Sequence, residues 1–472
     1  MKEKDISDLV GRYKQMLVSG KSIYFDAEEF DELAEYYDLM DENDTAKIIV
    51  ETGLKIHPTS DALRLKKAKY MLYEMKYEQA YEYIQNNFSE YDFELYLLKI
   101  ECLLHLDMYD EAGKLAAEIL QDDENELDIT YSELGFLYTE ADCFDDGTYF
   151  FERSLEFNPN NAEALTELSY AYEMKGDYSS AVKTSNKILD IDPYSFETWV
   201  NIGKLYTMLE EYENAIDAFD FALTINDSDT NLLKLKAHCL FLSDRVEEAL
   251  EIFETCINLS PNDAPLLYSL AECYLALEDY DQMLDYLDKY QAIKGESSDV
   301  IAKKAFAYMQ KGDIEKSWSF IKQGLDLDPD SEDLNVVAGE IKFLSNDFNE
   351  AEGYFLKAHE TNTGNETILD RLSVISISKD QFERAIGYLE DLLLIDPKSP
   401  AKIRLALLYF ETGDQDRFDE YLDSFANEDL KSLLEVFFPE SRFDLSMITR
   451  EALIARLDDA RECRQLFKNI QY

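Results

Sequence analysis

The sequence holds few of the residues that end helices, with 16 glycines and 9 prolines among 472 residues. Inside a helix, proline costs roughly 3 kcal/mol and glycine about 1 kcal/mol relative to alanine. Their scarcity, combined with 46% hydrophobic and 31% charged residues, argues against a disordered chain. It predicts a large and mostly helical core.

Basic residues are also scarce, because 45 Lys and Arg stand against 100 Asp and Glu, for a formal net charge of -55. A surface this negative repels phosphate backbones and lipid headgroups, so we expect no nucleic-acid partner. No apolar run approaches the roughly 18 residues of a spanning helix, and the first residues, MKEKDISDLV, are charged where a secretory signal is apolar. We therefore expect a cytoplasmic protein with no membrane insertion.

Residues that carry chemistry are few and dispersed. The six cysteines show no CxxC spacing, and the four histidines lie far apart in the sequence, so we expect no metal site and no cofactor. The chain also lacks the G-x-S-x-G, Walker, H-E-x-x-H and dinucleotide-binding motifs. These absences predict that the protein is not an enzyme and has no catalytic residues.

What the sequence does contain is an internal period, which the prolines reveal. Pro159, Pro193, Pro261, Pro329 and Pro397 are separated by 34, 68, 68 and 68 residues. Fixed spacing of this kind is typical of repeat proteins. The period is therefore 34 residues.

Twelve repeats follow when Phe196 is taken as position one. They start at Ala27, Asp61, Phe93, Asp128, Ala162, Phe196, Thr230, Ala264, Ser298, Glu332, Glu366 and about Pro400. Positions eight and twenty hold Ala, Gly or Ser in ten of the twelve repeats; Ile100 and Leu407 are the exceptions at position eight. Small residues let the two amphipathic helices of a repeat approach closely, which predicts such a contact at Gly203.

This pattern resembles the tetratricopeptide repeat family over roughly residues 27 to 429. The family's signature places are occupied in one repeat by Trp199, Ile202, Gly203, Tyr206, Ala215, Phe219 and Ala222. The resemblance implies an all-α, right-handed superhelical solenoid of about twelve 34-residue helix-turn-helix repeats.

We expect three regions in the chain: an N-terminal capping helix in residues 1–26, the repeat array in 27–429 and C-terminal capping helices in 430–472. The last region places Ile448, Leu453, Leu457, Ala460 and Leu466 at helical spacing, as a cap on the final repeat requires. A partner-binding helix is the alternative for this region.

The resemblance also implies a function, because the first helices of such repeats line a concave groove that holds a peptide or helix of another protein. We therefore expect a monomeric interaction scaffold or adaptor. One alternative is a structural subunit that self-associates or docks through its terminal helices. Another is an enzyme that acts within the groove.

The family's groove positions are two, five, nine and twelve of each repeat. In the central repeats they hold Lys204, Asn231, Lys234 and His238, with Asn201 at position six and Tyr170, Tyr268 and Phe306 at flanking groove positions. Cations converging in so acidic a chain predict a site for a partner's carboxylate terminus or acidic side chain. The alternative is that these lysines only offset neighbouring acids.

Some members of the family bind carboxy-terminal peptides through a clamp of Lys, Asn, Asn, Lys and Arg. Asn201 matches one clamp place, whereas Thr166, Tyr170, Asn231 and Leu235 occupy the other four. The mismatch argues against a receptor of that type.

The first repeat has the opposite charge at its groove positions. Glu28, Asp31, Glu35 and Asp38 occupy all four of them. This arrangement predicts a docking site for a basic segment, with a polar end face needed for solubility as the alternative.

Overall fold

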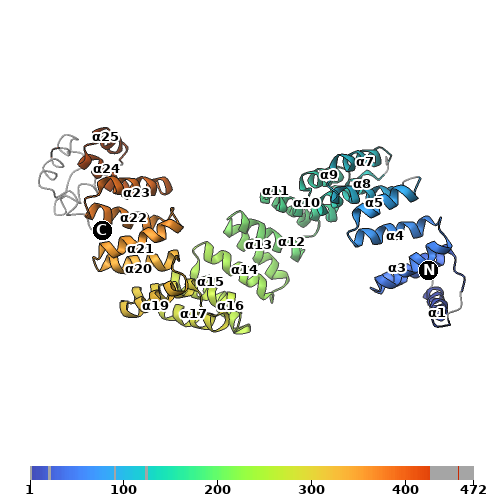
Figure 1. Ribbon diagram of the computed structural model, residues 1–472, viewed down its shortest axis with the longest axis horizontal. Coiled ribbons are helices and arrows are strands. Elements are labelled where there is room, and N and C mark those ends of the chain that lie inside the picture. The colour runs from blue at the N-terminus through green and yellow to red at the C-terminus, as the bar shows by residue number, and fades with distance from the viewer. Residues whose placement is uncertain (1–2, 20–22, 90–91, 123–125, 426–454, 456–472) are drawn as a thin grey trace. The chain divides into compact units, whose positions relative to one another are not determined.

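The computed structural model of the chain describes residues 3–19, 23–89, 92–122, 126–425 and 455, and every regular element within these ranges is a helix. Helix α1 spans Glu3–Ser19, and successive antiparallel pairs of helices follow it (Figure 1). The all-α class and the paired helices predicted from the sequence are confirmed.

Each repeat contributes a first and a second helix. The first helices are α2 (Ala27–Leu39), α4 (Asp61–Tyr73), α6 (Phe93–His105), α8 (Leu127–Glu140), α10 (Ala162–Met174), α12 (Phe196–Met208), α14 (Thr230–Leu242), α16 (Ala264–Ala276), α18 (Ser298–Gln310), α20 (Glu332–Leu344), α22 (Glu366–Ser378) and α24 (Ala401–Thr412). The second helices are α3 (Asn43–Ile56), α5 (Tyr77–Asn87), α7 (Tyr109–Asp122), α9 (Phe144–Phe157), α11 (Tyr178–Ile191), α13 (Tyr212–Ile225), α15 (Val246–Leu259), α17 (Tyr280–Lys294), α19 (Ile314–Leu327), α21 (Phe348–Thr361), α23 (Phe382–Ile395) and α25 (Gln415–Ser424).

The first helices begin where the 34-residue period places the repeats. Ten of the twelve start at the predicted residue, α8 starts one residue early and α24 starts one residue after Pro400. Short polar side chains fix several of these starts. The carboxylate of Asp229, for example, accepts hydrogen bonds from the backbone N–H groups of Asn231 and Leu232 at 2.9 and 3.0 Å, which caps α14.

Each helix pair turns at a residue with a positive φ, at position fifteen in the first eleven repeats and position fourteen in the last. These residues are Asp41, Met75, Asp107, Asp142, Gly176, Glu210, Asp244, Glu278, Gly312, Asn346, Asp380 and Gly413. After Gly176, the N–H of Asp177 donates to the carbonyl of Tyr172 at 2.9 Å, which satisfies an acceptor at the end of α10. The same left-handed turn therefore reverses the chain in every repeat.

The two helices of a repeat touch where position eight meets position twenty-four. A Cβ added at Gly203 would lie 2.3 Å from Cε1 of Phe219, whose side chain is fully buried. Glycine and phenylalanine meet in the same way at Gly135 with Phe151 and at Gly339 with Phe355, with a nearest distance of 2.7 Å in each. The prediction that Gly203 permits close helix approach is confirmed.

Other repeats divide the same space differently. In the third repeat the larger residue is on the first helix, because Ile100 at position eight shares a buried cluster with Ala116 at position twenty-four. In the fifth repeat, the hydroxyls of Ser169 and Ser185 lie 2.7 Å apart and form a buried hydrogen bond. In each case the space between the two helices limits the combined size of the residues at positions eight and twenty-four.

The chain divides into two compact units, residues up to Arg245 and residues from Val246 onward. We call them the N-terminal and C-terminal units. In the N-terminal unit, α1 packs on α2, with the ring of Tyr13 6.2 Å from that of Tyr37. The expected C-terminal capping helices, with Ile448, Leu453, Leu457, Ala460 and Leu466, lie outside the described residues.

The contact at Gly203 gives a direct test of the packing. We expect Gly203→Ala to lower the free energy of unfolding by about 1–3 kcal/mol, because the added methyl group overpacks a filled site. The exposed Gly113 of α7 has no atom within 4 Å of an added Cβ, so Gly113→Ala should instead stabilise by about 0.5–1 kcal/mol. Urea unfolding with hydrogen exchange in α12 and α13 measures both, and a Gly203→Ala protein as stable as wild type would contradict this packing.

Candidate functional site

The candidate partner-binding residues lie on one stripe of the first helices. This stripe carries positions two, five, six, nine, twelve and thirteen of each repeat, and we call it the first-helix face. Tyr170 is on α10, Asn201 and Lys204 are on α12, and Asn231, Lys234 and His238 are on α14. These six residues belong to the N-terminal unit, whereas Tyr268 on α16 and Phe306 on α18 belong to the C-terminal unit.

Four of the six residues in the N-terminal unit are exposed: Tyr170, Lys204, Asn231 and His238. Asn201 and Lys234 are half-buried. The ammonium of Lys204 makes no ion pair or hydrogen bond with any residue that the structure describes. A cation in this state can pair with an external carboxylate without first breaking an internal contact.

Helices α12 and α14 present their faces side by side. The hydroxyl of Thr207, at position twelve of its repeat, lies 3.2 Å from Sγ of Cys239 on α14. This contact shows that α12 and α14 are adjacent. That Lys204, Lys234 and His238 form one partner-binding site stays a prediction.

The two candidates in the C-terminal unit are engaged within that unit. The hydroxyl of Tyr268 donates to Oδ2 of Asp299 at 2.8 Å, and Nζ of Lys303 lies 5.7 Å from the centre of its ring. The half-buried Phe306 packs against a buried cluster, and its ring lies 6.4 Å from that of Tyr280. Their role toward a partner remains a prediction.

The acidic residues of the first repeat are divided in a similar way. Asp31 pairs with Lys66 of α4 at 3.7 Å, and Asp38 accepts a hydrogen bond from the hydroxyl of Tyr70 at 2.7 Å. Glu28 and Glu35 are exposed. Two of the four acids thus join the first repeat to the second, and two stay open to a partner.

Sequence reasoning missed a second acidic surface on α6, α8 and α10. It comprises Glu101, Glu133, Glu140, Glu163 and Glu167. Burial, and then the nearby Glu140, raise the pKa of Glu101 to about 7. Burial is also the largest cause of the raised pKa of Glu133, and the charge of Glu163 adds to it. The pKa of Glu167 is raised by burial first, and then by the charges of Glu163 and Glu140. The repeat frame could have shown the pattern, since Glu133, Glu140 and Glu167 lie at positions six and thirteen, and Glu101 and Glu163 at the groove positions nine and two.

Three acids on the first-helix face of the C-terminal unit each meet a base from the next repeat. Lys303 pairs with Glu272 at 3.0 Å and Arg371 pairs with Glu340 at 2.7 Å. Arg404 of α24 pairs with Asp370 of α22. These ion pairs neutralise the three acids, whereas Asp333 of α20 makes no ion pair with the described residues and burial raises its pKa.

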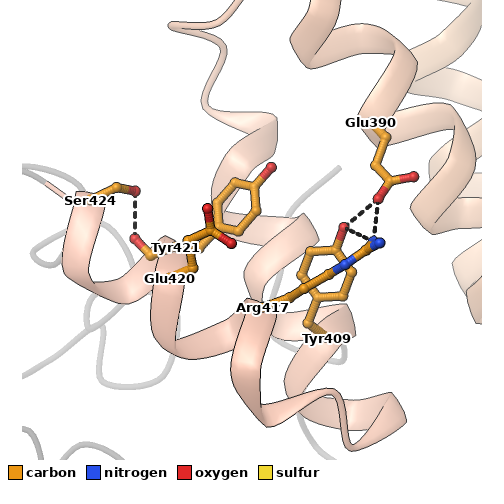
Figure 2. A pocket seen from close by; sticks show the side chains of 6 residues that line it. All are labelled: Glu390, Tyr409, Arg417, Glu420, Tyr421 and Ser424. Carbon is orange, nitrogen blue, oxygen red and sulfur yellow. Dashed lines mark hydrogen bonds and ion pairs between the residues drawn. The ribbon is translucent and has the colours of Figure 1, made fainter.

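A cavity of about 310 Å³ lies at the end of the C-terminal unit, among residues of α23, α24 and α25 (Figure 2). Arg417 pairs with Glu390 at 2.6 Å and donates to the hydroxyl of Tyr409 at 3.0 Å, and that hydroxyl donates to Glu390 at 2.5 Å. Because these polar groups satisfy one another, we assign no ligand to the cavity.

Among the described residues, His, Cys, Asp and Glu form no cluster of three or more that could hold a metal ion. Within the same ranges, none of the helices is both long and apolar enough to cross a bilayer.

Three stretches of the chain match known sequence families. Residues 196–229 and 298–331 match a family described as Tetratricopeptide repeat, and residues 150–183 match another of the same description. Residues 220–290 match the family described as Anaphase-promoting complex, cyclosome, subunit 3. The first two stretches coincide with the repeats formed by α12 with α13 and by α18 with α19.

One curated relative is the Sol locus transcriptional repressor of Clostridium acetobutylicum, which is 27% identical over 141 residues. The match covers 30% of this chain, and this chain spans only 41% of the relative's length.

Two solved structures show distant likeness. A tetratricopeptide repeat protein from Parabacteroides merdae is 16% identical, with 53% of this chain and 99% of that chain covered and a TM-score of 0.42. The Cut9-Hcn1 hetero-tetramer of APC/C is 14% identical, with 97% and 92% covered and a TM-score of 0.40. Scores this low support no argument about function.

The raised pKa of Glu101 predicts a pH-dependent stability. The folded protein binds a proton here up to about pH 7, whereas an unfolded glutamate releases it near pH 4.3, so stability is lost as the pH rises through this window. We expect Glu101→Gln to be more stable than wild type by about 1 kcal/mol near pH 8.5, after allowance for partial exposure, and the gain to shrink near pH 5.5.

Urea unfolding of both proteins at the two pH values measures this difference. Glu118→Gln, at an exposed site on α7, is the control and should show no such change. A gain for Glu101→Gln that is equal at both pH values would contradict the assignment.

Proposed function

Because the chain is a tetratricopeptide repeat protein, a class that mediates protein–protein interaction, we propose that it is a scaffold or adaptor. It binds a peptide or helical segment of a partner protein on the first-helix face of the N-terminal unit. The residues that contact the segment are Tyr170, Asn201, Lys204, Asn231, Lys234 and His238. In the C-terminal unit, considered by itself, Tyr268 and Phe306 are proposed as partner-contacting residues of its own first helices.

The observation that supports this proposal most directly is the state of Lys204. It is exposed on α12 and makes no ion pair or hydrogen bond with the described part of the chain, although acids outnumber bases by 100 to 45 in the sequence. His238 is exposed on the adjacent helix, α14. Two donors in this position suit a carboxylate of the partner, and the exposed ring of Tyr170 adds apolar contact.

The matched families describe repeats and a subunit of an assembly rather than a catalytic domain. This supports binding as the activity. The alternative, a structural subunit that docks through its terminal helices, depends in part on residues 430–472, which lie outside the described residues. The exposed Glu28 and Glu35 of the first repeat are a separate docking site for a basic segment in the same proposal.

A charge reversal on α12 and α14 tests the proposal. We expect the Lys204→Glu, Lys234→Glu variant to lose partners that immobilised wild-type protein retains from lysate of the source cells, because two carboxylates then face the acidic segment. The control is Lys183→Glu, Lys187→Glu, which makes the same charge change at exposed sites on the second helix α11. Circular dichroism establishes equal helicity in the three proteins.

The control variant should retain the same partners as wild type. If both variants lose them equally, net charge alone governs capture. If neither variant loses them, the lysines of α12 and α14 are ordinary surface residues and the proposed site is wrong.

A further inference from the structure

The last four first helices of the N-terminal unit, α8, α10, α12 and α14, differ sharply in charge. Helices α8 and α10 carry six acids and no base: Asp128, Glu133, Glu140, Glu163, Glu167 and Glu173. Helices α12 and α14 carry one acid, Glu197, and four basic residues: Lys204, Lys234, His238 and Lys236, the last of which pairs with Asp220 of α13. The sign of the charge on the first helices therefore changes between α10 and α12, although the chain as a whole is acidic.

The acids of α8 and α10 act on one another across helices. Glu133 interacts with Glu163, and Glu167 interacts with both Glu163 and Glu140. No cation lowers the pKa of Glu133 or Glu167 to offset these effects. Partly buried carboxylates without a counter-ion cost free energy, which a basic side chain from outside would recover.

The acidic and basic surfaces are continuous in the fold. Tyr172 of α10 and Leu205 of α12 pack in the same cluster, and α12 meets α14 through Thr207 and Cys239. One stretch of partner chain can therefore cross all four helices. At roughly 3.3 Å per residue, an extended segment of about 10 residues covers three interhelix spacings of about 10 Å each.

Exposed apolar side chains lie along the same path. Ile129 of α8 is 47% exposed, Tyr170 of α10 is 45% exposed and Leu235 of α14 is 37% exposed. All three lie on the first-helix face. They offer apolar contacts between the charged groups, as the centre of a protein interface requires.

We propose that the first-helix face from α8 to α14 is a polarised docking surface for an extended partner segment that is basic over α8 and α10 and acidic over α12 and α14. The change of sign fixes the direction in which the segment lies. This inference rests on the proposed function and adds the chemistry of the partner to it.

Synthetic peptides of about 12 residues test the charge pattern. One carries a block of lysines, an apolar centre and a block of glutamates. A second has the same composition with lysine and glutamate alternating. We expect the block peptide to bind the full-length protein at least about tenfold more tightly, because only the block peptide matches both surfaces.

Two variants assign the ends of the segment. The first is the double variant Glu133→Gln, Glu167→Gln, and the second is the double variant Lys204→Gln, Lys234→Gln. Each should weaken binding of the block peptide about tenfold. A third peptide, with glutamine in place of every glutamate, should respond to the first variant and not to the second. The matched controls are Glu111→Gln, Glu118→Gln on α7 and Lys183→Gln, Lys187→Gln on α11, at exposed sites of second helices, and they should leave binding unchanged.

Several outcomes would overturn the proposal. The first is that the block and alternating peptides bind within about twofold of each other. The second is that the control variants weaken binding as much as the first-helix variants. The third is that the block peptide does not bind at all. If the lysate partners still depend on Lys204 and Lys234 in that case, the proposed function stands and only the polarised segment is wrong.

Discussion

The close contact between positions eight and twenty-four determines how the two helices of each repeat lie together. At Gly203 the backbone of α12 lies against the ring of Phe219, with no room for a methyl group. The third repeat exchanges the large and small residues, with Ile100 at position eight and Ala116 at position twenty-four in one buried cluster. Since the limit applies to the pair rather than to one residue, the helix spacing is kept while the individual residues vary.

The helix contact and the left-handed turn of each repeat depend on residues that do not lie on the first-helix face. The residues of that face can therefore vary between repeats without a change of fold. Several of its acids are paired internally, as Glu340 is with Arg371. Glu101, Glu133 and Glu167 make no such ion pair with the described residues, and burial beside Glu140 raises the pKa of Glu101. The same scaffold therefore carries neutralised acids at some places on this face and unsatisfied acids at others. The unsatisfied acids are the ones suited to a partner.

The sequence alone predicted the helix pairs, their starts and the role of Gly203, because these depend on short-range periodicity and residue size. It also identified Lys204 and His238 by repeat position. It could not predict that Tyr268 and Phe306 would be engaged within their own unit, since those contacts depend on side-chain directions across repeats. It missed the burial of Glu101 for the same reason, because a pKa shift depends on neighbours from other helices.

The most direct test of the account is chemical footprinting of carboxylates and amines, by mass spectrometry, with and without a bound partner. The account predicts that the partner protects Glu163 of α10 and Lys204 of α12, both exposed on first helices, and leaves Lys183 and Lys187 of α11 as reactive as before. Protection confined to the second helices would contradict the claim that partners bind on the first-helix face.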